Sequence, residues 1–415
     1  MQGGTGAGGR KAMTDTTLPP LGLYVHLPWC VAKCPYCDFN SHTAPARLPT
    51  REYTCALLAD LDHALPQLAG RRPRSIFIGG GTPSLFPAAD IERLLTGIRD
   101  RLQLAADVEI TLEANPGTLA AGRFRAFRDA GVNRLSLGIQ SFDDTMLAAL
   151  GRIHDGAGGH RAAETALAAG FDSVNLDLMY GLPGQTVAAA MADLETALAL
   201  APDHLSWYEL TLEPNTVFWS RPPALPDSDT TADIEAAGST RLRRAGYERY
   251  EVSAWARAPA QRCRHNLNYW SFGDYLGIGA GAHGKLTDAA AITREARVRA
   301  PDKYLQRAPR GAAIAERRCL SSADAAFEFL LNALRMPAGF AIADFEARTG
   351  VALAALEPAL TAAQDDGLLV RTATAVRPTE PGLTYLNDLL ARLDTAIERW
   401  RSGRERIARI PVAVE

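Results

Sequence analysis

Six short, apolar, β-rich runs occur in the first half of the chain, and each is followed by a longer pattern with apolar residues at helical spacing. Parallel strands need a crossover of a dozen or more residues between them, so this alternation predicts βα units and a parallel sheet. The predicted strands are Leu21–His26, Ser75–Ile78, Val108–Glu113, Arg134–Gln140, Val174–Tyr180 and Leu205–Leu212. Periodicity alone leaves an open doubly wound sheet and a barrel as alternatives.

The ends of these strands favour the barrel. Polar or glycine residues stand there: His26, the Gly79–Gly81 run, Glu113, Gln140 and Asp177. The carboxyl ends of parallel strands form the site in α/β folds, so several such groups converging on one rim indicate a barrel or partial barrel. We therefore expect residues 18–220 to form a partial (β/α)6 barrel.

The remaining sequence predicts a second, smaller domain. With 415 residues, the chain exceeds the roughly 100–200 residues of one ordinary domain. We expect residues 221–319 to extend the barrel, with one strand at Tyr247–Trp255, and residues 320–395 to form a mainly helical, winged-helix-like domain. The helical patterns there are Ala323–Leu334, Ile342–Thr349, Leu353–Asp366 and Thr384–Arg399, with a short hairpin at Gly367–Val370 and Ala375–Pro378. Residues 1–17 are expected to be a disordered leader and 396–415 a basic tail.

Charge and composition exclude several classes of function. The net charge is −3, and residues 320–393 carry nine acidic residues against five Arg, which is the wrong sign for a surface that binds nucleic-acid phosphates. No apolar run reaches the roughly 18 residues of a membrane span, and no secretory signal is recognisable, so we expect a cytoplasmic protein. The basic segment 399–409 is either a solvated tail or a peripheral contact with a membrane surface or a partner.

Three of the six cysteines, Cys30, Cys34 and Cys37, lie within eight residues directly after the first predicted strand. Zinc sites commonly use two separated ligand pairs, and no second CxxC or CxxH pair exists here. Three thiolates can instead hold three irons of a [4Fe–4S] cluster and leave the fourth iron open. S-adenosylmethionine can chelate an open iron, and the reduced cluster can then release a 5′-deoxyadenosyl radical from it.

The spacing CxxxCxxC, with an aromatic residue before the last cysteine, resembles the signature of radical S-adenosylmethionine proteins. The segments YVHLPWCVAKCPYCDFN, IGGGTPS, SLGIQSFDD and NLDLMYGLPGQT resemble one branch of that superfamily, which contains the oxygen-independent coproporphyrinogen III oxidases and the HemW-type haem chaperones. The resemblance covers nearly all of residues 18–392. By motif position it implies that Tyr24, Gly80 and Glu113 contact the cluster-bound S-adenosylmethionine. Gly81, Thr82, Gln140, Arg152 and Asp177 match positions that surround a second S-adenosylmethionine in the oxidases.

Two features separate the branches. The oxidase signature continues to a fourth cysteine, CxxxCxxCxC, where this chain has Phe39, and His265–Trp270 matches the HNxxYW motif of the chaperones. The resemblance therefore implies a haem chaperone that passes haem to acceptor proteins. The alternatives are the oxidase, which decarboxylates coproporphyrinogen III propionates by hydrogen abstraction, and an interaction module whose cluster is only structural. A neutral imidazole commonly holds haem iron, so we expect His265 to contact haem, with Tyr269 and Trp270 forming a pocket wall.

Overall fold

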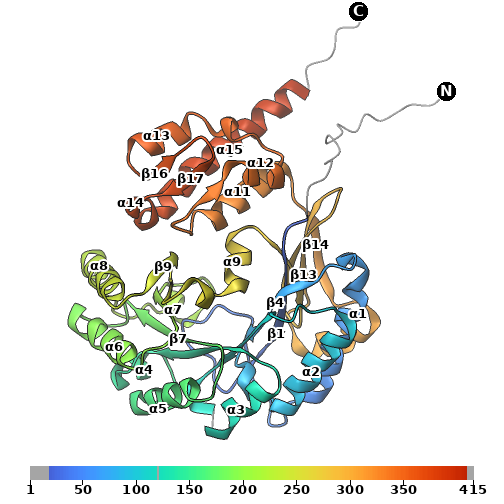
Figure 1. Cartoon of the computed structure of the whole chain (residues 1–415), viewed down its shortest axis with the longest axis vertical. Coiled ribbons are helices and arrows are strands. Elements are labelled where there is room, and N and C mark those ends of the chain that lie inside the picture. Colours follow the sequence, from blue (N-terminus) through green and yellow to red (C-terminus); the bar gives the residue numbers. More distant parts are fainter. Residues whose placement is uncertain (1–17, 119–120, 409–415) are drawn as a thin grey trace, which may run out of the picture.

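The structure, a computed structural model, describes residues 18–118 and 121–408. A curved sheet with helices along its outer face forms a large unit, and a smaller, mainly helical unit lies against one end of it (Figure 1). The expected leader, residues 1–17, lies outside the described residues.

All six expected strands are present and pair in parallel, in chain order. They are β1 (Leu21–Leu27), β4 (Pro73–Gly80), β5 (Glu109–Ala114), β6 (Arg134–Gln140), β7 (Ser173–Tyr180) and β8 (His204–Glu209). All seven residues of β6 are buried, which is typical of a parallel strand covered on both faces. Among the described residues the whole sheet has two free edges, at β14 (Ile314–Cys319) and β9 (Glu248–Glu251), so it is a partial barrel rather than a closed one.

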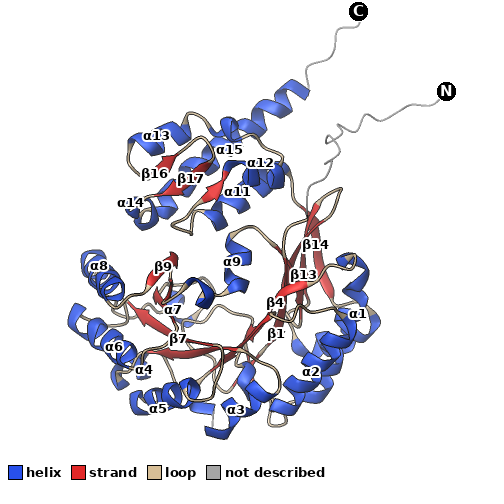
Figure 2. Ribbon diagram, viewed as in Figure 1, coloured by secondary structure: helices blue, strands red, loops and turns tan. Residues whose placement is uncertain are grey.

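Helices cover the convex face of the sheet, and its concave face is left for the site (Figure 2). The outer helices are α1 (Thr50–Leu68), α2 (Ala88–Arg101), α3 (Ala121–Asp129), α5 (Gly156–Leu167), α6 (Val187–Ala199) and α8 (Ser228–Arg244), with the short α4 (Asp144–Ala149) after β6. Leu57 and Leu61 of α1 and Leu95 of α2 are fully buried in the core beneath them. The expected βα units are confirmed by this arrangement.

Strands from residues 221–319 lie at both ends of the sheet and lengthen it, but they are more numerous than the sequence predicts. At one end β11 (Asp274–Ile278) runs parallel to β1, and three antiparallel strands follow it: β12 (His283–Thr287), β13 (Ile292–Arg297) and β14 (Ile314–Cys319). The exposed strand β14 has no apolar alternation that could have predicted it. At the other end, the single strand expected at Tyr247–Trp255 is wrong. The chain turns back on itself there and forms a hairpin of β9 (Glu248–Glu251) and β10 (Ala254–Ala256).

Short elements lie between the sheet and the smaller unit or near the cysteine loop. They are β2 (Trp29–Cys30), β3 (His42–Thr43), α7 (Val217–Ser220) and α9 (Arg264–Trp270). A further short helix, α10 (Pro301–Arg307), packs on α1. Helix α9 lies between the barrel and the smaller unit (Figure 1). It packs on β1 and β4 on one side and on α11 (Ser322–Ala333) on the other.

The smaller unit has the expected winged-helix-like composition and its own core, which includes Phe329, Phe345 and Leu389. After α11 come β15 (Phe340–Ala341), α12 (Ile342–Thr349), α13 (Ala359–Asp365), β16 (Leu369–Arg371), β17 (Ala375–Pro378), α14 (Glu380–Thr384) and α15 (Leu386–Ala408), with sheet order β15-β17-β16. The helix expected at Leu353–Asp366 is wrong in its length: Leu353–Leu356 is a 3-10 turn, and α13 begins only after Pro358.

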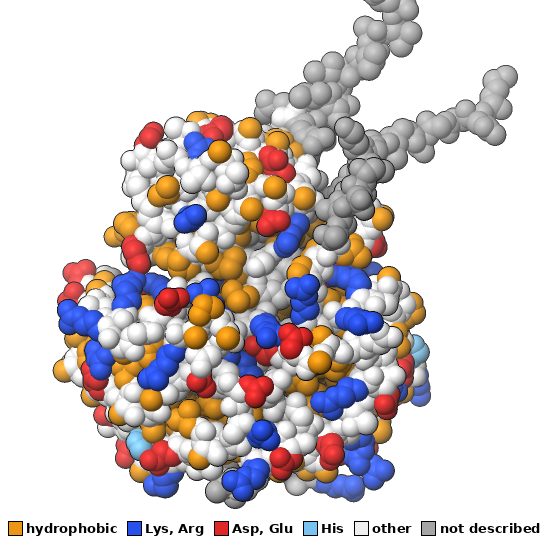
Figure 3. Space-filling view, viewed as in Figure 1, with side chains coloured by type: hydrophobic (Ala, Val, Ile, Leu, Met, Phe, Trp, Pro, Cys, Tyr) orange, Lys and Arg blue, Asp and Glu red, His pale blue; other side chains and the backbone are white. Residues whose placement is uncertain are grey.

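Helix α15 continues across the expected start of the basic tail at residue 396, and Ala396 and Ile397 are buried in the smaller unit's core. Aromatic side chains contribute to the contact between the two units: the ring centroids of Phe272, which follows α9, and Phe329 of α11 are 5.6 Å apart. Hydrophobic side chains gather on the visible face where the units meet (Figure 3).

Candidate functional site

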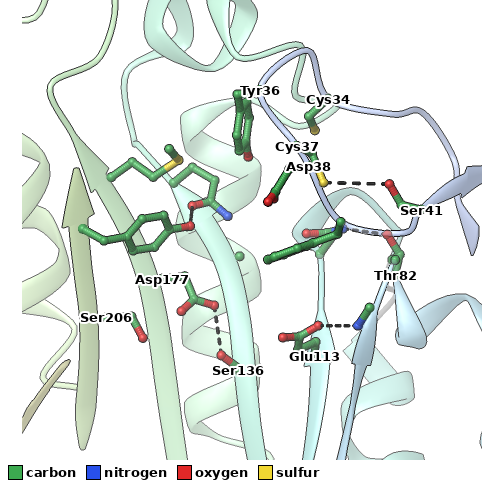
Figure 4. A pocket seen from close by; sticks show the side chains of 18 of the residues that line it. Cys34, Tyr36, Cys37, Asp38, Ser41, Thr82, Glu113, Ser136, Asp177 and Ser206 are labelled. Atoms are coloured by element: carbon green, nitrogen blue, oxygen red, sulfur yellow. Dashed lines mark hydrogen bonds between the residues drawn. The ribbon is translucent and has the colours of Figure 1, made fainter. Parts of the chain in front are cut away.

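A cavity of about 500 Å³ opens at the carboxyl ends of the parallel strands, beneath the cysteine loop (Figure 4). Ten of the twelve residues singled out from the sequence line it: Cys30, Cys34, Cys37, Gly80, Gly81, Thr82, Glu113, Gln140, Arg152 and Asp177. The strand ends therefore converge on one rim, as predicted, except for His26, which does not line the cavity. Tyr24 and His265 are not among the lining residues.

The cysteine loop places three free thiols at the mouth of the cavity. A turn brings Cys37 back onto Cys34, because the Cys37 amide donates to the Cys34 carbonyl at 3.2 Å. Burial raises the pKa of Cys30 and of Cys37, so ligating thiolates here need the positive charge that iron supplies. Within residues 18–118 and 121–408, no group of three or more His, Cys, Asp or Glu side chains is arranged to hold a single metal ion. A [4Fe–4S] cluster does not require its ligands to converge on one metal ion, because each thiolate holds a different iron. The three free thiols on one loop are therefore suited to hold such a cluster.

The glycine run joins the cysteine loop to the end of β4. Gly80 has φ of +115°, which side chains rarely adopt, and a Cβ on Gly81 would lie 2.6 Å from the Trp29 carbonyl oxygen. The amides of Gly81 and Thr82 donate to the carbonyls of Leu27 and Trp29 at 2.8 and 2.7 Å. Glycine here thus lets the backbone of β4 approach the cysteine loop closely.

Two carboxyl groups face the cavity from neighbouring parts of the sheet. Glu113 ends β5 and accepts a hydrogen bond from the Gly80 amide at 3.0 Å. Burial raises its pKa to about 7, and the charge of Asp177 adds to the shift. Asp177 accepts from the Ser136 hydroxyl at 2.9 Å, and burial raises its pKa as well. A cation between these groups would favour their ionised forms.

Gln140 and Arg152 add an amide and a guanidinium to the lining of the cavity. Gln140 adopts a left-handed φ of +71°, and its side-chain oxygen accepts from the Tyr208 hydroxyl at 2.8 Å. Arg152 donates to the Gly138 carbonyl at 2.6 Å, and its Nη1 lies 3.8 Å from the Cys34 sulfur. A guanidinium is therefore held beside one of the predicted cluster ligands.

Tyr24 and His265 lie below the cavity, inside the barrel wall. The Tyr24 hydroxyl is 2.9 Å from His26 Nδ1. The His265 side chain is buried, with Nδ1 2.9 Å from the Ser75 hydroxyl and Nε2 3.0 Å from the Tyr269 hydroxyl. Burial lowers the pKa of His265 to about 3. The ring is neutral, as an iron ligand must be, but both nitrogens already have partners. This conformation does not present His265 to a ligand, contrary to the expected direct contact.

The HNxxYW segment forms helix α9, which explains its spacing. His265 and Tyr269 are four residues apart and face the barrel wall. Asn266 and Trp270 are also four apart, and both line the cavity. Asn266 was not predicted as a site residue, although the helical spacing of the motif points to it. Arg335, which follows α11 and also lines the cavity, has no sequence signal that points to it.

The curved parallel sheet with a three-cysteine loop at its mouth defines this chain as a radical S-adenosylmethionine protein. Residues 24–197 match the family model of the radical SAM superfamily, and residues 320–385 match that of the HemN C-terminal domain. The superfamily implies a [4Fe–4S] cluster and S-adenosylmethionine. The chain is 49% identical to the haem chaperone HemW of Escherichia coli over 374 residues, which is 90% of this chain and 98% of that protein. It therefore belongs to the HemW family.

Other relatives span most of the chain too. Identity is 47% to HemW of Haemophilus influenzae, covering 90% of this chain and 97% of that one. It is 36% to the mitochondrial radical S-adenosyl methionine domain-containing protein 1 of Bos taurus, covering 91% and 88%. Among solved structures, the coproporphyrinogen III oxidase HemN of Escherichia coli matches with a TM-score of 0.78, at 26% identity over 91% of each chain. None of the helices in residues 18–118 and 121–408 combines the length and apolar character needed to cross a membrane.

Proposed function

We propose that this protein is a cytoplasmic haem chaperone, which binds haem and passes it to acceptor proteins. The observation that carries the proposal is Phe39. It stands where the oxidases have a fourth cysteine, and it lines the cavity while the residue remains 60% exposed. The oxidase shares the fold, so the fold does not separate the two functions. The identity of 49% to a haem chaperone, against 26% to the oxidase, supports the chaperone.

In this proposal Cys30, Cys34 and Cys37 hold the [4Fe–4S] cluster through their thiolates. When bound, the cluster with S-adenosylmethionine supplies one-electron reduction of the sulfonium group. Gly80 and Gly81 line the cavity without side chains, which allows close approach of a ligand, and Glu113 accepts hydrogen bonds from its amino group or ribose.

Further polar groups line the same cavity. Thr82, Gln140, Arg152 and Asp177 present a hydroxyl, an amide, a guanidinium and a carboxyl group to the same space. They orient the ligand and exclude water from its reacting end. Tyr24 acts from behind, because its hydroxyl positions His26 under the glycine run.

In this proposal haem binds at the HNxxYW end of the cavity. Asn266 and Trp270 face that space, and His265 is a positioning residue that holds α9 to the barrel wall. The acceptors are proteins and not nucleic acid, in keeping with the acidic smaller unit. The basic end of α15 remains a candidate for peripheral contact with a membrane surface or an acceptor.

One preparation tests the proposal. The protein is reconstituted anaerobically with iron and sulfide, and iron content, haemin binding and coproporphyrinogen decarboxylation are measured on the same sample. We expect about four irons per chain, a Soret shift on haemin addition, and no decarboxylation. Cys37→Ala should lose the cluster, whereas Cys55→Ala, an exposed cysteine on α1, should keep it. Decarboxylation by the reconstituted protein would make the oxidase the better assignment.

A further inference from the structure

Resting on the proposed haem-chaperone function, we propose that Arg335 and Trp270 bind a carboxylate of the tetrapyrrole at the end of the cavity where the two units meet. Arg335 comes from the smaller unit and Trp270 from α9 of the large one. Both line the same cavity as the cysteine loop. A ligand held here would touch both units at once.

The contact between the two side chains is direct. The Arg335 guanidinium carbon lies 4.3 Å from the centroid of the Trp270 ring, close enough for a cation–π interaction. Arg335 Nη2 also donates to Glu251 Oε2 at 3.1 Å. Glu251 is almost fully buried, while 28% of the Arg335 side chain is exposed. The guanidinium is thus oriented on two sides and open on the cavity side.

Two hydrogen-bond donors beside this contact lack an acceptor. Arg335 Nε and Trp270 Nε1 are both buried, and neither has a hydrogen-bond partner. Buried donors without an acceptor are uncommon in folded proteins, and each needs an explanation. A guanidinium presents Nε and Nη2 on one edge, which matches the two oxygens of a carboxylate. A carboxylate that displaced Glu251 from Nη2 would gain Nε as well.

Glu251 can be displaced from Arg335 by a ligand carboxylate without losing all its hydrogen bonds. Its other oxygen, Oε1, accepts from the Ser253 amide at 3.1 Å, so the carboxylate keeps one partner when Arg335 leaves it. In the ligand-free state Glu251 neutralises a guanidinium that would otherwise stand alone near an apolar ring. It therefore acts as a stand-in for the acidic group of the ligand.

The surroundings fit an amphipathic ligand with acidic ends. Apolar side chains of Met179 and Leu210 line the same cavity, and Phe39 and Ile153 at its edge are 60% and 52% exposed. Hydrophobic side chains gather at the junction of the units, with Lys and Arg beside them (Figure 3). Haem offers an apolar macrocycle and two propionates, so it satisfies both features. S-adenosylmethionine also carries a carboxylate, and the experiment must distinguish the two sources.

The test compares haemin with haemin dimethyl ester, whose propionates cannot ionise. We expect the wild-type protein to bind haemin about tenfold more tightly than the ester, since a charge-assisted pair is lost. Arg335→Gln should remove this preference by weakening haemin binding about tenfold and leaving the ester unchanged. Arg335→Lys should retain part of the preference, because it keeps the charge and loses the two-donor edge. Glu251→Gln should bind haemin at least as tightly as wild type.

The matched control is Arg371→Gln, which breaks an ion pair with Glu357 on the same unit, outside the cavity. Equal losses for haemin and ester in Arg335→Gln, or parallel losses in Arg335→Gln and Glu251→Gln, would mean that the pair only joins the two units, and would overturn the inference. A loss of S-adenosylmethionine affinity without loss of haemin affinity would overturn it too. Failure of the wild-type protein to bind either haem compound would instead defeat the proposed function.

Discussion

His265 Nδ1 lies 2.9 Å from the hydroxyl of Ser75, so a buried pair 190 residues apart in the chain ties α9 to β4. The His265 ring also stacks on Phe77 with centroids 5.1 Å apart. A Cβ added to Gly22 of β1 would lie 3.2 Å from the same ring, so the space around it is filled. His265 therefore holds the HNxxYW helix in place, and the face with Asn266 and Trp270 is the one left to meet a ligand.

The neutral state of His265 predicts a loss of stability in acid. Its folded pKa is about 3, below the 6.5 of an unfolded histidine, so between these values the unfolded chain binds a proton that the folded chain does not. Its contribution is complete above pH 6.5 and falls as the pH drops towards 3, by up to about 1.4 kcal/mol per pH unit. The free energy of unfolding, measured in urea at pH 7 and pH 5, should fall less in His265→Gln than in wild type.

The control for this comparison is His63→Gln, which changes an exposed histidine on α1. It should show the wild-type difference between pH 7 and pH 5. His26 and His204 are also held neutral by burial, so part of the acid sensitivity should persist in His265→Gln. An unchanged difference in His265→Gln would show that the residue does not contribute in this way.

Glu113 predicts the opposite dependence on pH. Its folded pKa of about 7 lies above the usual glutamate pKa of 4.5, so the folded chain holds an extra proton between these values. Its contribution to stability is complete below pH 4.5 and is lost as the pH rises through 7. At pH 8, Glu113→Gln should raise the free energy of unfolding of the cluster-free protein by roughly 2–3 kcal/mol. Urea unfolding of wild type and Glu113→Gln at pH 8 and pH 4.5 measures this difference in the free energy of unfolding.

At pH 4.5 the same substitution should have a much smaller effect, because Glu113 is then protonated in the folded chain and half protonated in the unfolded chain. Glu92→Gln on α2 is the surface control and should be neutral at both pH values. A destabilised Glu113→Gln at pH 8 would mean that the ionised carboxylate stabilises the fold, contrary to the burial argument. Sequence position alone could not supply this prediction, since it depends on how deeply the fold buries Glu113 and on the nearby charge of Asp177.

Arg152 should influence the reduction potential of the cluster. Its Nη1 lies 3.8 Å from the Cys34 sulfur, and a nearby positive charge favours the more negative, reduced cluster. Arg152→Gln should therefore lower the potential by on the order of 50 mV, measured by potentiometric titration of the reconstituted protein without substrate. Arg161→Gln, on the exposed side of α5, should leave it unchanged. An unaltered potential in Arg152→Gln, with full iron content, would contradict this role.

The sequence predicted the features that local patterns determine. Parallel strands show as apolar runs with polar ends, and the cysteine spacing marks the loop after β1, so ten of the twelve chosen residues meet in one cavity. What it could not predict depends on contacts between distant segments. The partners of His265 come from β4, and Arg335 reaches Trp270 only because the two units pack together. The polar strand β14 is similarly stabilised by pairing with β13 rather than by its own pattern.

The two faces of α9 give the last prediction, because they separate stability from haem binding within one motif. Tyr269→Phe removes a hydroxyl 3.0 Å from His265 Nε2, which should cost about 1 kcal/mol of stability and leave haemin affinity unchanged. Trp270→Ala removes a half-buried ring that faces the cavity, and it should weaken haemin binding severalfold. Urea unfolding and haemin titration on both variants measure the two effects. If Tyr269→Phe lost haemin binding while Trp270→Ala kept it, the face towards the barrel wall would be the haem-binding one, and α9 would have to move away from β4 to expose it.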